Sequence, residues 1–138
     1  MFYPAKFHKE TDGVCVITFR DIPEAITQGD DEKDAMEMAG DALISAFDFY
    51  FEDKRIIPAP SKLRHDEHLI EVPPSIAAKV LLLNEMLIQK VKPIDLARRM
   101  SIKPQEVHRL IDLAHNTKID TINLALAALG KHLELQAV

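Results

Sequence analysis

Residues 93–110, which read PIDLARRMSIKPQEVHRL, decide the fold of the second half of the chain. Pro93 and Pro104 each stand where a short helix can begin, because proline has no amide hydrogen to leave unpaired in the first helical turn. We therefore predict one helix over residues 93–100 and another from Lys103-Pro104 to about residue 113. Two short helices joined by a tight turn have to bury a small shared core. The apolar side chains placed to form that core are Leu96, Met100, Ile102, Val107 and Leu110.

This segment resembles a helix-turn-helix of the phage-repressor type. Ala97 stands where the two helices approach most closely, and Ser101 occupies the turn position that is usually glycine. The resemblance implies that the helix from Pro104 is a recognition helix, which enters the major groove of DNA. The residues on its outward side, with the lysine before it, are the predicted DNA-binding residues: Lys103, Pro104, Gln105, His108, Arg109 and Asp112.

These residue types suit contacts with bases and phosphates. Gln105 can form two hydrogen bonds with adenine, and Arg109 can do the same with guanine. Lys103 and the amino end of the helix suit phosphate. The alternative interpretation is a plain helical lobe with an exposed polar face. The sequence favours DNA binding, because the core positions, the polar face and the charge of this half of the chain agree.

Helical patterns flank this pair of helices on both sides. One covers residues 76–89, and the other covers about 120–129, where Gly130 ends it. Residues 132–138 then alternate polar and apolar side chains, which is the period of a strand. No partner strand lies nearby in the sequence, so we expect this strand to pair with a second copy of the chain. The apolar positions expected at the dimer contact are Leu133, Leu135 and Ala137.

The first half of the chain predicts an α+β layer. Its expected order is β-β-β-α-β, over residues 2–9, 14–19, 25–28, 30–53 and 66–72. Asp30 or Asp31 is expected to cap the start of the helix. Pro73-Pro74 then marks a boundary, because proline stops a strand and suits a helix start. We therefore expect two domains, residues 1–72 and residues 73–138.

The predicted helix over residues 30–53 has two distinct faces. One face carries mostly small apolar residues that suit packing on a sheet: Ala35, Ala39, Ala42, Leu43, Ala46 and Tyr50. The opposite face carries only acidic residues in its line: Asp34, Glu37, Asp41, Asp48 and Glu52. Such a line is either a solvated surface or a docking face for a basic partner.

Charge is divided unevenly along the chain. Residues 1–70 carry a net charge of −7, whereas residues 71–138 carry +2, for a total of −5 over 138 residues. This asymmetry suggests that one lobe faces a cationic partner and the other an anionic partner. Because +2 is small for a monomeric DNA-binding protein, a dimer is expected, which would double the number of phosphate contacts.

Several classes of protein are excluded by the composition. The longest aliphatic run, Val80-Leu81-Leu82-Leu83, is far shorter than the roughly 20 residues of a membrane helix, and the N-terminus has no pattern of a secretory signal. The single cysteine, Cys15, cannot form an internal disulfide. We therefore expect a cytoplasmic protein without membrane contact.

Catalytic signatures are weak. The glycines do not cluster into a phosphate loop, and no nucleophile with its base can be identified. His65, Asp66, Glu67 and His68 are expected to be solvated loop residues rather than a metal site. The sequence predicts no enzyme, no metal and no cofactor.

Several motifs along the whole chain resemble the HicB antitoxin family. They are Asp21-Ile22-Pro23, Gly29-Asp30 with Ala35, Ala39 and Ala42 after it, Phe47-Asp48-Phe49-Tyr50-Phe51-Glu52, Ile70-Glu71-Val72-Pro73 and Leu96-Ala97-Arg98-Arg99. Many members have proline followed by glycine and cysteine in the first motif, where this chain has Pro23-Glu24-Ala25.

The resemblance implies a truncated, non-catalytic ribonuclease-H-like lobe joined to a DNA-binding helix-turn-helix lobe. It also implies that the chain inhibits a HicA-type toxin, which is a basic ribonuclease that cleaves mRNA. The pair would repress its own operon by binding operator DNA. The antitoxin would assemble as a homodimer or a dimer of dimers through its C-terminal region.

Two other functions compete with this interpretation. A stand-alone transcription regulator with a ligand-sensing first lobe would keep the DNA contacts and have no toxin partner. An active ribonuclease H would need carboxylates that bind magnesium at strand ends. Because the predicted strands 2–9 and 14–19 contain no Asp or Glu, that second alternative fails.

Overall fold

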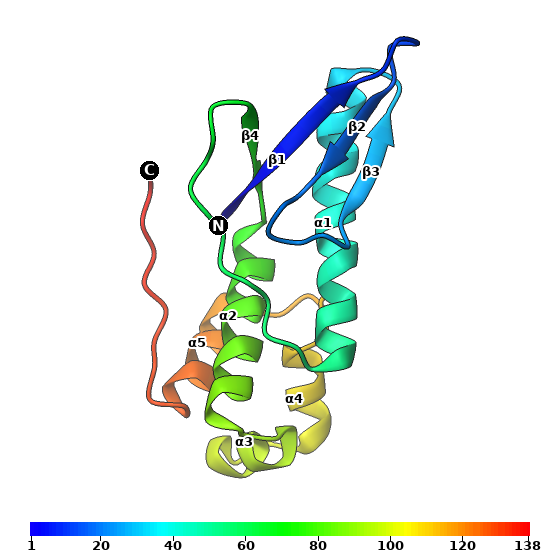
Figure 1. Cartoon of the computed structure of the whole chain (residues 1–138). Coiled ribbons are helices and arrows are strands. Elements are labelled where there is room, and N and C mark those ends of the chain that lie inside the picture. Colours follow the sequence, from blue (N-terminus) through cyan, green and yellow to red (C-terminus); the bar gives the residue numbers. More distant parts are fainter. The chain divides into compact units, whose positions relative to one another are not determined.

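The computed structural model describes residues 1–138 and has an α+β fold, with one four-stranded antiparallel sheet and five helices (Figure 1). The chain divides into two units. The first comprises Met1–Tyr50 and Ile57–Pro73. The second comprises Phe51–Ile56 and Pro74–Val138. The α+β class and the β-β-β-α-β order of the first half are confirmed.

The sheet of the first unit contains β1 (Phe2–Lys9), β2 (Cys15–Thr18), β3 (Ile26–Gly29) and β4 (Glu67–Glu71). Their order is β3-β2-β1-β4, and every neighbouring pair is antiparallel. The apolar residues of β1 pair with apolar residues on both sides: Tyr3 stands opposite Ile70, and Phe7 stands opposite Ile17. This register places one apolar face of the sheet toward the helix.

Helix α1 (Glu32–Asp53) begins at a local capping arrangement. The Asp31 side chain accepts the backbone N–H of Asp34 at 2.8 Å, and the Asp34 carboxylate accepts the N–H of Asp30 at 2.9 Å. Asp31 is therefore the capping residue. Gly29, at the end of β3, lies so close that a Cβ there would be 2.3 Å from the backbone nitrogen of Ala35. Only glycine permits this approach.

The core of the first unit lies between α1 and the sheet. The buried side chains of α1 are Ala35, Ala39, Leu43, Ala46, Phe47 and Tyr50. The predicted apolar face is confirmed, except that Ala42 is only half-buried and Phe47 was not included in it. The Phe47 ring packs against Tyr3 of β1, with 5.6 Å between ring centroids.

The segment between α1 and β4 has no regular secondary structure and is tied to the sheet by hydrogen bonds. The Asp21 carboxylate accepts bonds from the backbone N–H and the hydroxyl of Ser61, and the Tyr3 hydroxyl donates to the Pro58 carbonyl at 2.6 Å. Ile22, beside Asp21, is fully buried. The Asp21-Ile22-Pro23 motif therefore has a structural role in holding this segment.

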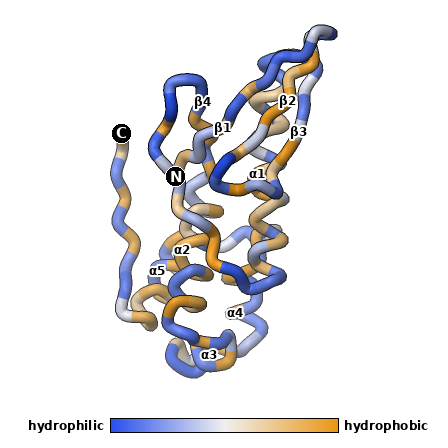
Figure 2. Tube along the Cα trace, in the orientation of Figure 1, coloured by the Kyte–Doolittle hydropathy of each residue, from blue (hydrophilic) through white to orange (hydrophobic).

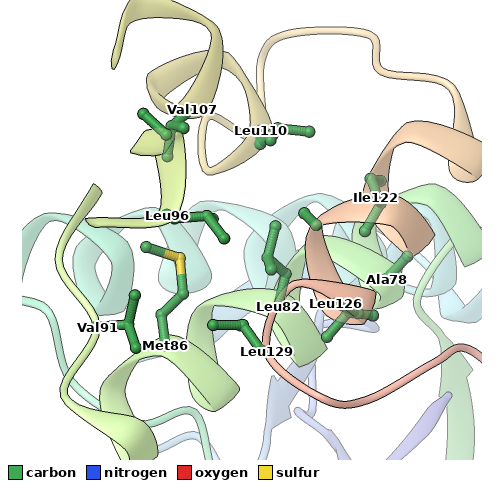
Figure 3. Packing of buried hydrophobic residues seen from close by; sticks show 12 residues of the cluster. Ala78, Leu82, Met86, Val91, Leu96, Val107, Leu110, Ile122, Leu126 and Leu129 are labelled. Atoms are coloured by element: carbon green, nitrogen blue, oxygen red, sulfur yellow. The ribbon is translucent and has the colours of Figure 1, made fainter. Parts of the chain in front are cut away.

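The second unit contains α2 (Pro74–Gln89), α3 (Pro93–Met100), α4 (Pro104–Leu110) and α5 (Ile119–Ala127). Figure 3 shows their shared core, in which Leu82 and Met86 of α2 lie near Leu96, Ile122 and Leu129. All four predicted helices are present, although α4 ends three residues earlier than expected. None of the helices combines the length and apolar character that crossing a membrane requires.

The segment after α5 differs from the prediction. Residues 132–138 form no strand within the chain and run as an extended tail (Figure 1), in which hydrophilic and hydrophobic residues alternate (Figure 2). A strand needs a hydrogen-bonding partner, and only Leu133 is fixed, through its N–H to the Asn123 side chain at 2.8 Å. Pairing with a second copy stays a prediction.

Candidate functional site

Helices α3 and α4 pack on each other through the residues expected from the sequence. Leu96, Ala97, Val107 and Leu110 are all buried, and Leu96 and Val107 are completely so. The other two predicted core residues are partly buried against the same cluster: Met100 and Ile102. The small side chain of Ala97 is buried in the core that the two helices share. The pair is therefore a rigid unit with one face left for solvent.

The turn between α3 and α4 is closed by backbone hydrogen bonds. The N–H of Ser101 donates to the Arg98 carbonyl at 3.2 Å, and the N–H of Ile102 donates to the Ala97 carbonyl at 3.0 Å. Ser101 adopts φ 55° and ψ 42°, the left-handed conformation that glycine enters most easily. Serine therefore adopts a conformation that favours glycine, with some backbone strain.

The predicted DNA-binding residues lie on the solvent side of α4, with one exception. Five of the predicted residues are exposed at the start of α4 or along it, where Glu106 is exposed as well: Lys103, Pro104, Gln105, His108 and Arg109. Asp112 is also exposed, but α4 ends at Leu110, and the Asp112 carboxylate accepts the N–H of Ala114 at 3.0 Å. The prediction that Asp112 lies on the same helix was therefore wrong, because the chain turns before that residue, and its contact with DNA stays a prediction.

A buried lysine, which was not singled out from the sequence, supports the end of α4. The ammonium group of Lys79 donates to the carbonyl oxygens of Arg109 at 3.1 Å, Asp112 at 2.6 Å and His115 at 2.5 Å. Burial lowers the pKa of Lys79, and the nearby charge of Asp112 opposes that shift. The sequence could have indicated this buried lysine, because Lys79 stands three residues before Leu82, on the apolar side of α2. Its role is to hold the chain where α4 ends.

A groove of about 610 Å³ lies beside α4 in the second unit. Its apolar lining includes Leu110 and Leu124, and its cationic lining comes from Arg99, Arg109 and Lys118. Because these cations come from α3, α4 and the segment before α5, the cationic side chains extend beyond α4 alone, and the exposed Glu106 of α4 also lines the groove. Arg99 and Lys118 were not identified from the sequence, since nothing local indicates that they lie near Arg109.

The acidic face of α1 is largely accessible. Four of its five predicted members are exposed: Glu37, Asp41, Asp48 and Glu52. The fifth, Asp34, is half-buried and belongs to the capping arrangement at the start of the helix. Asp34 therefore has a structural role, and the four others form the surface that could meet a basic partner.

The residues at 65–68 were expected to be solvated in a loop, but Glu67 and His68 lie in β4 and Glu67 is buried. Glu67 accepts two hydrogen bonds from the Arg20 guanidinium, at 2.9 and 3.0 Å, and Asp66 forms an ion pair with Lys6 at 3.4 Å. The bond from Arg20 holds the pKa of Glu67 below its usual value. The rings of His68 and Phe7 pack in a T-shaped arrangement, with 5.0 Å between their centroids. The Glu67 and Asp66 carboxylates therefore tie the start of β4 to its neighbours.

Comparison with known proteins gives matches over the whole chain. A family model described as "HicB_like antitoxin of bacterial toxin-antitoxin system" matches residues 2–81. The chain is 56% identical to Antitoxin HicB 2 of Photorhabdus laumondii subsp. laumondii, covering 100% of this chain and 97% of that protein. It is 51% identical to Antitoxin HicB of Escherichia coli (strain K12), covering 100% of both. It is 33% identical to Antitoxin HicB of Pseudomonas fluorescens (strain Pf0-1), covering 96% of this chain and 91% of that protein.

Proposed function

The chain belongs to the HicB-like antitoxin family of bacterial toxin-antitoxin systems, and from this premise we propose that it inhibits a HicA-type mRNA-cleaving ribonuclease and represses its own operon. Residues 1–72 would be the toxin-neutralising, ribonuclease-H-like domain. Residues 73–138 would bind operator DNA and dimerise. The observation that carries the antitoxin role is the identity of about half the residues with Antitoxin HicB over the full length of both chains.

The DNA-binding half of the proposal is supported by α3, α4 and the turn between them. Their side chains form one packed core, and the exposed face of α4 carries Gln105, His108 and Arg109, which suit contacts with base edges. In this helix-turn-helix, α4 is the recognition helix. A dimer would place two such helices on half-sites separated by about 10 base pairs or a multiple of that spacing.

The toxin-binding half of the proposal is supported by charge. The net charge of −7 over residues 1–70 and the exposed acids on α1 are complementary to a basic ribonuclease. This antitoxin is therefore proposed to inhibit the toxin by binding to it.

Growth rescue tests the antitoxin role directly. The small reading frame beside this gene is expressed with and without the chain, while growth and mRNA integrity are followed. We expect the neighbour alone to stop growth and degrade mRNA, and co-expression of this chain to restore both. A harmless neighbour, or toxicity that this chain cannot relieve, would contradict the proposal and favour a stand-alone transcription regulator.

A further inference from the structure

The exposed surface of α1 carries a line of side chains that has no role in the core. Met38 and Phe49 are 41% and 58% exposed, although both are large and apolar. Ala42 and Ser45 lie between them, and successive members are four, three and four residues apart. This spacing places all four on one side of the helix, over a length of about 16 Å. We call this line the α1 seam.

Phe49 differs from the other aromatic residues of its stretch. Phe47 is fully buried against Tyr3, and Tyr50 is buried and donates its hydroxyl to Glu24 at 2.7 Å. Phe49, between them, extends toward solvent instead. An aromatic ring gains much when it is buried in a partner and loses little conformational freedom there, so such residues often anchor interfaces.

The acids of α1 lie directly beside the seam. Glu37, Asp41 and Asp48 follow a parallel line along the helix, and each is exposed. Together, the seam and the acids form an apolar strip with an anionic border along one side. The residues at the centre of the strip are small. Ala42 and Ser45 leave space for another backbone to approach closely, whereas Met38 and Phe49 project at either end. A complementary partner needs an apolar helix face with a basic border.

We propose that the α1 seam receives a helix of the basic ribonuclease toxin, with Phe49 as the main anchor at one end of the seam. This inference rests on the proposed antitoxin function and assigns its docking surface. The apolar contact holds the complex together, whereas the acidic border attracts the toxin and sets its orientation. The apolar residues should therefore affect mainly the dissociation rate constant and the acids mainly the association rate constant, so kinetic measurements can separate the two effects.

Binding kinetics with the purified toxin test this assignment. Phe49→Ala is expected to raise the dissociation rate about tenfold or more, with little change in association. The double variant Glu37→Gln with Asp41→Asn is expected to slow association and to reduce its dependence on salt. Ile88→Ala is the matched control, because this aliphatic residue on α2 is 60% exposed and should leave both rates unchanged.

A second variant blocks the seam without removing an apolar group. Ser45→Lys places a long cation in the space that the small residues of the seam leave for the partner, and it should weaken toxin binding. Because position 45 is exposed, this variant should fold even if Phe49→Ala does not. If the wild type binds the toxin tightly and both Phe49→Ala and Ser45→Lys bind with unchanged rates, the seam is not the docking surface and the proposed function stands. If the wild type does not bind the toxin at all, both proposals fall.

Discussion

Ser101 is a single residue whose backbone conformation determines how two helices meet. Its positive φ of 55° costs an L-amino acid about 1–2 kcal/mol, and glycine avoids this cost while losing more freedom on folding. We therefore expect Ser101→Gly to raise the free energy of unfolding by about 0.5–1 kcal/mol, measured by denaturant unfolding. The matched control is Ser45→Gly in the exposed middle of α1, which should lower that free energy by about 0.5 kcal/mol. If both Ser101→Gly and Ser45→Gly lower the free energy of unfolding, the inference that the backbone is strained at Ser101 is wrong.

Glu67 is the residue through which acid should weaken the first unit. Hydrogen bonds from Arg20 and from the N–H of Arg64 hold its pKa below the ordinary value. A carboxyl whose pKa is lower in the folded than in the unfolded chain stabilises the fold above its unfolded pKa of about 4.3. That stabilisation disappears as the pH falls through the folded pKa.

Comparing the wild type with Glu67→Gln isolates this contribution. We expect the wild type to have the higher free energy of unfolding at about pH 7, and the difference between the two proteins to shrink as the pH falls below about 4.3. Denaturant unfolding at a series of pH values measures both proteins. A difference that stays constant with pH would mean that the charge of Glu67 contributes nothing.

At the scale of elements, α4 carries the proposed DNA contacts independently of the first unit. Arg109→Ala is expected to weaken operator binding by about 1–3 kcal/mol and to leave toxin binding intact. The Arg109 side chain is exposed, and only its backbone carbonyl accepts a bond from Lys79, so the substitution leaves that support in place. Titration of operator DNA at fixed salt measures the first effect. Equal loss of DNA and toxin binding would indicate damage to the fold instead.

At the scale of the whole molecule, the tail after α5 is the part that the rest of its own chain holds least. Leu135 is 75% exposed, and residues 134–138 make no backbone hydrogen bond that holds them to the chain. If the tail pairs with its counterpart, Leu135→Glu places a charge on the apolar side of the paired strands. Gln136→Glu adds the same charge on the polar side. We expect the first variant to become monomeric and the second to remain a dimer, as measured by sedimentation. If both Leu135→Glu and Gln136→Glu remain dimeric, the tail is not the dimer contact.

The elements of this antitoxin could be predicted from local patterns. Each of the patterns acts over a few residues: the period of two in β1, the small apolar face of α1 and the prolines that begin α3 and α4. For that reason their positions were predicted to within about three residues. The strand expected over residues 132–138 does not form within the chain. Among the elements that do form, the short α4 was the least accurate, because its end depends on contacts with the rest of the unit, among them the bonds from Lys79.

The sequence by itself determined the α+β class, the order of the elements, the buried face of α1 and the core residues of α3 and α4. Only the tertiary structure decided that Glu67 pairs with Arg20 and that Lys79 supports the end of α4. It also decided that Phe49 remains exposed while Phe47 and Tyr50 are buried. The reason is physical: periodicity and capping act between neighbours in the chain, whereas Arg20 and Glu67 are 47 residues apart and Lys79 and His115 are 36 apart. Contacts of that range depend on how the elements pack, and no local spacing encodes them.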